Sequence, residues 1–174
     1  MSNVEIGFSE LCKGPSVYLE NKNKMAYKLG GDDHQFALAS QGFSSGKHYC
    51  EFTLETEPYE KSVIIGVTLK RNDFYLNSNE MKGFYSFVLS ECKKVSNNTK
   101  LESVEYGDIT KMGDRIGVLM EFQATGLDVS FFINKINMGI AFKNLPLNTY
   151  YPCVVLGFDG TRVRMTNKVR FPDI

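Results

Sequence analysis

The sequence holds one pair of side chains with the types and spacing of a nucleophile and its base, His48 and Cys50. Residues two apart on a strand point to the same face, and an imidazole can activate a thiol for nucleophilic attack. Cys50, however, alternates in step with Phe52 and Leu54, so we expect its thiol in the apolar interior. Burial there raises the pKa of a thiol and keeps it inert. No further polar residue is placed to orient the imidazole, and we therefore expect no catalytic residue in this chain.

Three acidic residues, Asp32, Asp33 and Asp159, could supply oxygen ligands to a calcium ion. Calcium loops space such ligands densely along one short run, and this sequence contains no run of that kind. The glycines also fall outside the spacing of nucleotide-binding loops, which follow G-x-x-x-x-G-K-[ST] or G-x-G-x-x-G. We expect neither a metal ion nor a cofactor.

Four basic residues recur at even positions near the C-terminal end: Arg162, Arg164, Lys168 and Arg170. If the strand continues, they form one basic face. We favour a charged edge strand that discourages aggregation; the alternative is a docking surface for an acidic partner or for RNA phosphate. The 20 basic and 20 acidic residues of the chain balance, so no general field attracts nucleic acid or an anionic membrane. We expect neither as a partner.

The chain length indicates the number of domains, and the cysteine content indicates the redox state of the compartment. The 174 residues suit one domain, which we expect to span residues 1–174. No run of about 18 apolar residues is present, and the N-terminus lacks the features of a secretory signal. Four cysteines lie far apart and form no C-x-x-C pair, namely Cys12, Cys50, Cys92 and Cys153. This usage favours reduced thiols, and we expect a monomeric intracellular protein, cytoplasmic or nuclear.

The sequence pattern predicts that the elements that position these residues are β-strands. Apolar and polar residues alternate over residues 115–122 and 127–134, and links containing Gly126 and Gly139 follow these runs. The pattern predicts a three-stranded meander over residues 113–142, with hairpin turns at 123–126 and 134–139. Such a meander has one apolar face, which a second sheet must cover.

The remaining chain continues the same pattern. Further strands are predicted at residues 17–20, 25–29, 36–39, 47–55, 62–69, 85–89, 150–158 and 161–167. Strands at intervals of roughly ten residues, without a helical period, predict an all-β sandwich of about eleven to thirteen strands.

Three stretches between or at the ends of these strands allow two interpretations each. Phe74, Tyr75 and Leu76 lie in a long polar connection, residues 70–82, and either fold back as a lid on the core or anchor a partner. Residues 30–34 are either a flexible turn or a backbone platform for a peptide. Leu156-Gly157 either ends a core strand or marks the close approach of a ligand.

Four stretches match a known family in the right order. They are residues 46–51 (GKHYCE), 65–67 (IGV), 113–118 with 129–134 and 139–142 (GDRIGV, VSFFIN and GIAF), and 150–152 (YYP). Together they resemble the SPRY domain over about residues 17–167. One departure concerns packing: the family usually has Trp where Cys50 stands, and this chain has no Trp. We expect some of its 13 Phe and 9 Tyr residues to fill the core instead.

The resemblance implies a bent antiparallel β-sandwich of the concanavalin-like type that binds a protein or peptide partner and is not an enzyme. Its partner-binding surface would be built by loops at one side of the sandwich. Carried onto this chain, the residues are Gly30, Gly31, Asp32, Asp33, His34, Phe74, Tyr75, Leu156 and Gly157. Family members with a known acidic-asparagine peptide motif have Trp where Leu156 stands, so that motif is not expected here.

The resemblance also suggests a setting and leaves an alternative. Such modules serve as substrate receptors or scaffolds in ubiquitin-ligase or chromatin complexes, and the sequence selects neither. The alternative is a lectin-like domain that binds carbohydrate, against which the absence of Trp for stacking on sugar rings counts.

Overall fold

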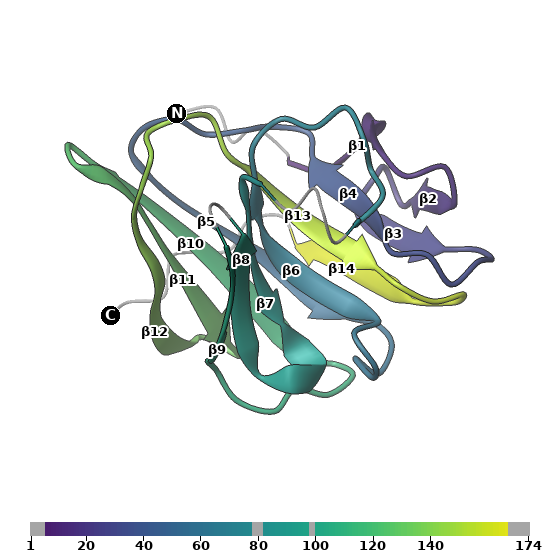
Figure 1. Cartoon of the computed structure of the whole chain (residues 1–174). Helices are drawn as coiled ribbons and strands as arrows, with labels where there is room; N and C mark the ends of the chain where they lie inside the picture. The colour runs from purple at the N-terminus through teal and green to yellow at the C-terminus, as the bar shows by residue number, and fades with distance from the viewer. Residues whose placement is uncertain (1–5, 78–81, 98–99, 167–174) are drawn as a thin grey trace.

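The computed structural model describes residues 6–77, 82–97 and 100–166, which form two antiparallel sheets of seven strands each (Figure 1). The first sheet consists, from edge to edge, of β1 (Phe8–Lys13), β4 (Gln35–Ala39), β13 (Tyr151–Leu156), β6 (Val63–Thr68), β7 (Phe84–Val88), β8 (Lys93–Asn97) and β9 (Leu101–Glu105). The second sheet consists of β12 (Ile136–Leu145), β11 (Gly126–Ile133), β10 (Arg115–Gln123), β5 (Lys47–Leu54), β14 (Arg162–Thr166), β3 (Met25–Lys28) and β2 (Val17–Glu20).

The predicted meander is confirmed as β10, β11 and β12, which pair in sequence order. The second turn is tighter than expected, because β12 already begins at Ile136. Asn134 and Lys135 alone make this turn, with φ of 50° and 69°, the left-handed values that a two-residue hairpin turn requires. Gly139 instead lies inside β12, where the register with β11 shifts.

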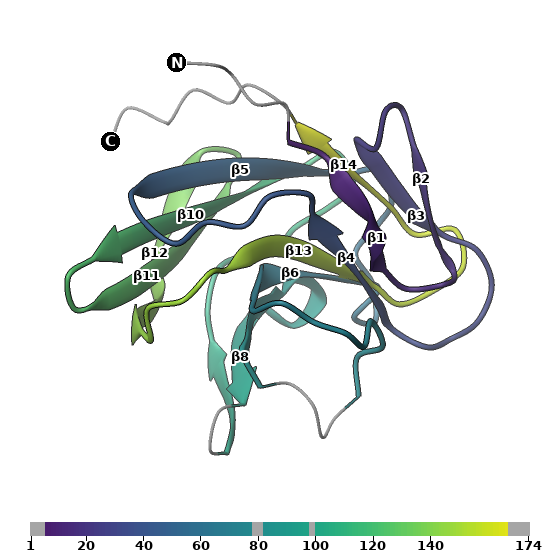
Figure 2. The same ribbon diagram turned by 90° about the horizontal axis from the view of Figure 1, so that it is seen from above.

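The two sheets stack as two layers with the main hydrophobic core between them (Figure 2). Phenylalanine side chains fill much of this core, and Phe52, Phe87 and Phe131 have no exposed surface. Cys50, at the position where the family has Trp, is buried in the same cluster. The all-β antiparallel sandwich and the aromatic filling predicted from the sequence are therefore confirmed.

A second, smaller hydrophobic cluster covers the outer face of the first sheet. This outer cluster contains Phe36, Leu38, Ile64, Phe84, Val88, Cys153 and Val155. Its members alternate along their strands with residues of the main core, as the period of two requires. The first sheet therefore carries apolar side chains on both faces, which explains the continuous apolar sequence of β6.

One expectation about strands was wrong, and one strand was missed. β14 is not an edge strand, because it pairs with β5 on one side and β3 on the other. Its partners come from distant parts of the chain, so a local pattern could not reveal them. β1 was not expected, and its register with β4 is broken between Phe8 and Lys13.

No helix in the described ranges is long and apolar enough to cross a membrane.

Candidate functional site

The three predicted loops meet at the start of β4. Gln35, the first residue of β4, is paired with Leu156 on β13 and forms an isolated bridge with Tyr75. Backbone hydrogen bonds fix this meeting point: the Phe36 amide donates to Phe74 O and the Leu76 amide to His34 O, each at 2.8 Å. Three segments that are far apart in the sequence thus lie side by side at the start of β4.

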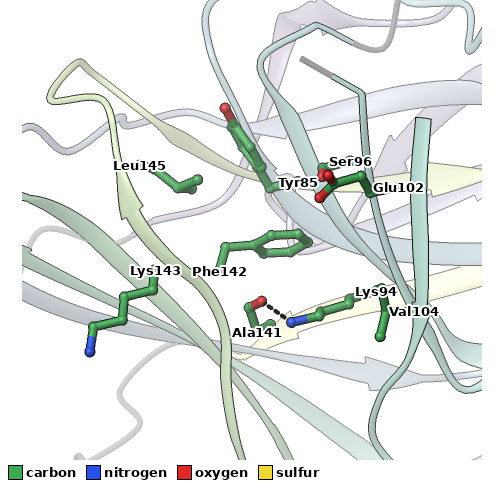
Figure 3. Close-up of a pocket in the computed structure, with 9 residues that line it drawn as sticks. All are labelled: Tyr85, Lys94, Ser96, Glu102, Val104, Ala141, Phe142, Lys143 and Leu145. Atoms are coloured by element: carbon green, nitrogen blue, oxygen red, sulfur yellow. Dashed lines mark hydrogen bonds between the residues drawn. The ribbon is translucent and has the colours of Figure 1, made fainter. Parts of the chain in front are cut away.

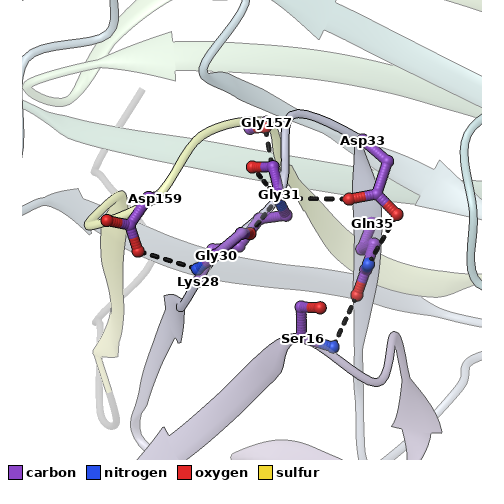
Figure 4. A network of polar contacts seen from close by, with 8 residues as sticks. All are labelled: Ser16, Lys28, Gly30, Gly31, Asp33, Gln35, Gly157 and Asp159. Atoms are coloured by element: carbon purple, nitrogen blue, oxygen red, sulfur yellow. Dashed lines mark hydrogen bonds and ion pairs between the residues drawn. The ribbon is translucent and has the colours of Figure 1, made fainter.

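A buried lysine shapes the loop of residues 30–34 (Figure 4). Lys28 has no exposed surface. Its ammonium donates to the carbonyl oxygens of Gly30 and Gly31 at 2.8 Å each and to that of Gly157 at 3.4 Å. The carboxylate of Asp33 lies 3.5 Å away. The desolvated charge is therefore balanced by backbone dipoles and one carboxylate.

Two acidic side chains of this region also accept hydrogen bonds that hold the loop. Asp159 accepts a hydrogen bond from the Gly30 amide at 2.7 Å. Asp33 accepts one from Gln35 Nε2 at 2.9 Å, and this bond, more than the nearby Lys28 ammonium, lowers the pKa of the Asp33 carboxyl. Asp32 is exposed. In the parts of the chain that the structure describes, no three His, Cys, Asp or Glu side chains are grouped to hold a metal ion.

These contacts change the expected role of the loop backbone. The carbonyl groups of Gly30, Gly31 and Gly157 already accept hydrogen bonds from Lys28, and the Gly157 amide donates to Ser62 O at 2.8 Å. The peptide platform considered from the sequence would have to share groups that the fold already uses. Hydrogen bonds within the protein therefore hold this loop in its conformation.

Leu156 does not belong to the surface, contrary to the expectation. Its side chain has no exposed area and lies in the main core, because it points inward from β13. Gly157 does mark a close approach, but by a side chain of this protein: a Cβ there would lie 2.6 Å from His34 Nε2. The core-strand interpretation of Leu156 therefore holds.

In the stretch Phe74-Tyr75-Leu76, between β6 and β7, half-buried and exposed side chains alternate. Phe74 and Leu76 are half-buried and pack against the outer cluster as a lid. Tyr75, between them, is 38% exposed. Of the three, Tyr75 has the exposure that a partner contact requires.

A groove on the outer face of the first sheet adjoins these loops. It has a volume of about 330 Å³ and is lined by His34, Lys61, Ile64, Leu76, Val88, Glu91, Val95, Leu101 and Ser103. Its aliphatic side chains come from β6, β7, β8 and β9 and from the lid. At its rim, Lys61 forms an ion pair with Glu91 at 3.2 Å, and His34 Nε2 donates to Lys61 O at 2.9 Å.

Sequence reasoning missed most of this groove. Val95 and Leu101 lie in a polar stretch, residues 91–101, which carries few apolar residues. Sequence reasoning also missed an aromatic row at the rim: Tyr59 stacks on Phe158 with ring centres 5.9 Å apart, and Phe158 meets the His34 ring edge-on at 5.7 Å. Tyr59 is 57% exposed.

The remaining candidates from the sequence have structural roles. The His48 ring stacks on Phe43 at 3.9 Å and donates from Nε2 to Ser45 O at 2.6 Å. Burial raises the pKa of the Cys50 thiol to about 12, so the thiolate that nucleophilic attack needs is scarce near neutral pH. All four cysteines are free thiols.

The basic residues of β14 are paired. Arg162 lies 3.7 Å from Glu20 and its guanidinium stacks over Tyr27 at 4.7 Å. Arg164 lies 2.9 Å from Glu55. Lys168 and Arg170 lie outside the described residues. The described half of the basic face is therefore largely neutralised.

Comparisons with known proteins agree with this fold. The family model of the SPRY domain matches residues 47–169. The E3 ubiquitin-protein ligase TRIM9 of Drosophila melanogaster is 33% identical over 138 residues, which are 77% of this chain and 18% of that protein. The chain thus spans less than a fifth of the length of this curated relative.

Solved structures show the same fold. The SPRY domain of human HERC1 superposes with a TM-score of 0.77 at 20% identity, covering 94% of this chain and all of the other. Another human SPRY domain gives 0.73 at 16% identity, covering 94% and 99% of the two chains. The TRIM65 PSpry domain gives 0.66 at 15% identity, covering 94% and 93%.

Proposed function

The chain belongs to the SPRY domain family of protein-interaction modules, and on that premise we propose that it binds a short linear segment of another protein. The proposed binding site is the groove whose apolar lining consists of Ile64, Leu76, Val88, Val95 and Leu101, with His34 beside them. The observation that carries this proposal is the apolar groove of about 330 Å³, which lies where the loops expected to form the site meet.

Burial of apolar side chains supplies the affinity in this proposal. One or two aliphatic side chains of the segment fill the groove, and Tyr75 and Tyr59 add exposed aromatic contacts beside it. Lys28 and the hydrogen bonds of β4 hold the site in place before binding, so little conformational entropy is lost on association. Affinities in the micromolar to nanomolar range are consistent with such a preformed site.

The function of the related TRIM9 protein suggests the complex in which this module acts. Because TRIM9 is an E3 ubiquitin-protein ligase, we propose that this module acts as a substrate receptor or scaffold of a ubiquitin ligase inside the cell. The four free thiols are compatible with a reducing compartment. We further propose that the chain is a monomer and that nucleic acid and membranes are not its partners.

Selection from a display library of random short segments tests the binding proposal. The groove variant His34→Ala/Leu76→Ala removes two side chains of the groove. The matched control His48→Ala/Leu11→Ala removes the same residue types from β5 and from the exposed face of β1, where Leu11 is 89% exposed. Circular dichroism and thermal unfolding establish first that both variants fold.

We expect the wild type and the control to bind the selected segments equally, and the groove variant to bind about tenfold more weakly or worse. Equal affinity of all three proteins would move the site away from the groove. Failure to select any segment would overturn peptide recognition as the function.

A further inference from the structure

The outer edge of β9 is free for pairing. β9 ends the first sheet, and β8 is its only neighbour among the described strands. All five of its residues are exposed, including the aliphatic Leu101 at 63% and Val104 at 52%. An edge strand presents a row of unpaired amide and carbonyl groups, which another extended segment can extend as a further strand.

The two faces of β9 adjoin two different cavities. Leu101 and Ser103 line the groove on the outer face. Glu102 and Val104 line a second cavity of about 240 Å³, which lies between the first sheet and β12 (Figure 3). Because alternate residues of a strand point to opposite faces, a strand added to β9 directs its side chains alternately toward these two sides.

The charges at the edge favour a basic segment. Glu102 and Glu105 are exposed on β9; Glu105 lies directly across from Lys93 on β8, whereas Glu102 lies across from Ser96 and has no ion-pair partner within the described ranges. Lys94 shares the second cavity with Glu102, but its ammonium donates to Ala141 O at 2.6 Å and lies 5.8 Å from the centre of the Phe142 ring (Figure 3). Lys143 lines the opposite wall, on β12. Opposite charges directly across two strands stabilise their pairing, and like charges destabilise it.

We propose that an extended segment of the partner adds to β9 as an eighth strand of the first sheet. Aliphatic side chains of this segment lie over Leu101 toward the groove, and a lysine or arginine lies opposite Glu102. The proposal rests on the binding site in the groove and adds how the segment is held there: by backbone hydrogen bonds to an edge strand and by an alternating aliphatic and basic sequence.

A synthetic peptide that alternates valine and lysine is the probe. A second peptide has the same composition with its valines consecutive, and a third carries N-methyl groups on the valines, which removes backbone donors. Binding to the full chain is followed by nuclear magnetic resonance titration, and amide hydrogen exchange is measured for β9. The edge variant is Glu102→Lys, which leaves the lining of the groove unchanged. Its matched control, Glu10→Lys, changes the same residue type on β1, the other edge of the same sheet.

We expect the alternating peptide to slow exchange of the outward-facing β9 amides about tenfold and the other two peptides to leave it unchanged. The edge variant should bind about fivefold to tenfold more weakly than the β1 control. Equal binding by the edge variant, or unchanged exchange at β9, overturns strand addition.

The groove variant separates this proposal from the proposed function. If that variant binds selected segments weakly while β9 exchange and the edge variant are unaffected, the groove site stands and strand addition falls. If the edge variant and β9 exchange respond and the groove variant does not, the groove falls as the site of this segment. If neither variant changes the binding of any segment, both proposals are overturned.

Discussion

The ammonium of Lys28 lies 3.5 Å from the carboxylate of Asp33, yet Lys28 is fully buried while the Asp33 side chain is 48% exposed. Such an asymmetric pair places the cost of desolvation on the lysine alone. The carbonyl oxygens of Gly30, Gly31 and Gly157 offset that cost, and they do so only in the observed loop conformation. The lysine therefore fixes the loop that borders the proposed site.

Lys28→Met is expected to destabilise the protein by about 2–3 kcal/mol, because the carbonyl oxygens of Gly30, Gly31 and Gly157 lose their charged donor. Methionine keeps most of the length of the side chain, so the loss reports the ammonium more than the packing. Urea unfolding at neutral pH measures the difference. The control is Lys47→Met, which removes an exposed ammonium paired with Glu121 at 3.0 Å and should cost less than about 1 kcal/mol. Equal effects of the two substitutions would contradict this role of Lys28.

Tyr106→Phe is expected to cost about 1–3 kcal/mol, because the Tyr106 hydroxyl completes the hydrogen bonds of an irregular strand pair. This hydroxyl accepts from the Phe131 amide at 3.0 Å and donates to Gly139 O at 2.6 Å, where the register between β11 and β12 shifts. Thermal unfolding measures the loss, and Tyr59→Phe at an exposed position serves as the control. A loss no larger than that of the control would show that water replaces the hydroxyl.

Stability is expected to fall as the pH rises above about 9, because burial raises the pKa of the Cys50 thiol from 9.0 to about 12. Above pH 9 the unfolded chain loses this proton and the folded chain keeps it, so the unfolded state is stabilised relative to the folded state over the window up to pH 12. Cys50 alone removes roughly 1 kcal/mol of stability by pH 10. Urea unfolding between pH 7 and pH 10 measures the slope.

Cys50→Ala should reduce that alkaline slope. Val118→Ala is the control, because Val118 is the cross-strand partner of Cys50 on β10 and is buried but not titratable. The control is expected to lower stability at every pH and to keep the slope of the wild type. The same slope in Cys50→Ala and in the wild type would assign the alkaline loss to other groups, such as the buried tyrosines.

Gly157→Ala is expected to displace the His34 ring, since the new Cβ would lie 2.6 Å from Nε2 in the present arrangement. The side chain of His34 then loses its hydrogen bond to Lys61 O, at a cost in stability of about 1 kcal/mol. The affinity for segments selected by the wild type should fall to the level of His34→Ala. Magnetic resonance of the imidazole and a binding titration check both outcomes.

The double variant Gly157→Ala/His34→Ala tests whether the glycine acts through the histidine. If it does, the double variant binds as His34→Ala does, and the two effects are not additive. Fully additive losses would mean that Gly157 contributes to binding by another route.

The alternation of apolar and polar residues was enough to predict most of the fold. The meander of β10, β11 and β12 followed from a period of two and from short links, because a strand with one buried face must alternate. The ordered SPRY motifs added the family and the loops that come together. β1 and the interior position of β14 did not follow, because the pairing of a strand depends on segments distant in the sequence.

The sequence by itself determined an all-β sandwich through its local periodicity, and the order of its motifs indicated the family. That residues 30–34 lie near Phe74 and Tyr75 was implied by the family resemblance and not by the periodicity. Only the tertiary structure decided which of those residues face outward. Leu156 and Tyr75 both occur in apolar surroundings, but the direction of β13 buries the first and the lid leaves the second exposed. The groove, too, exists because β8 and β9 bring Val95 and Leu101 beside Ile64 and Leu76. A cavity is a property of the side chains that enclose it, and their contacts arise only when distant segments pack.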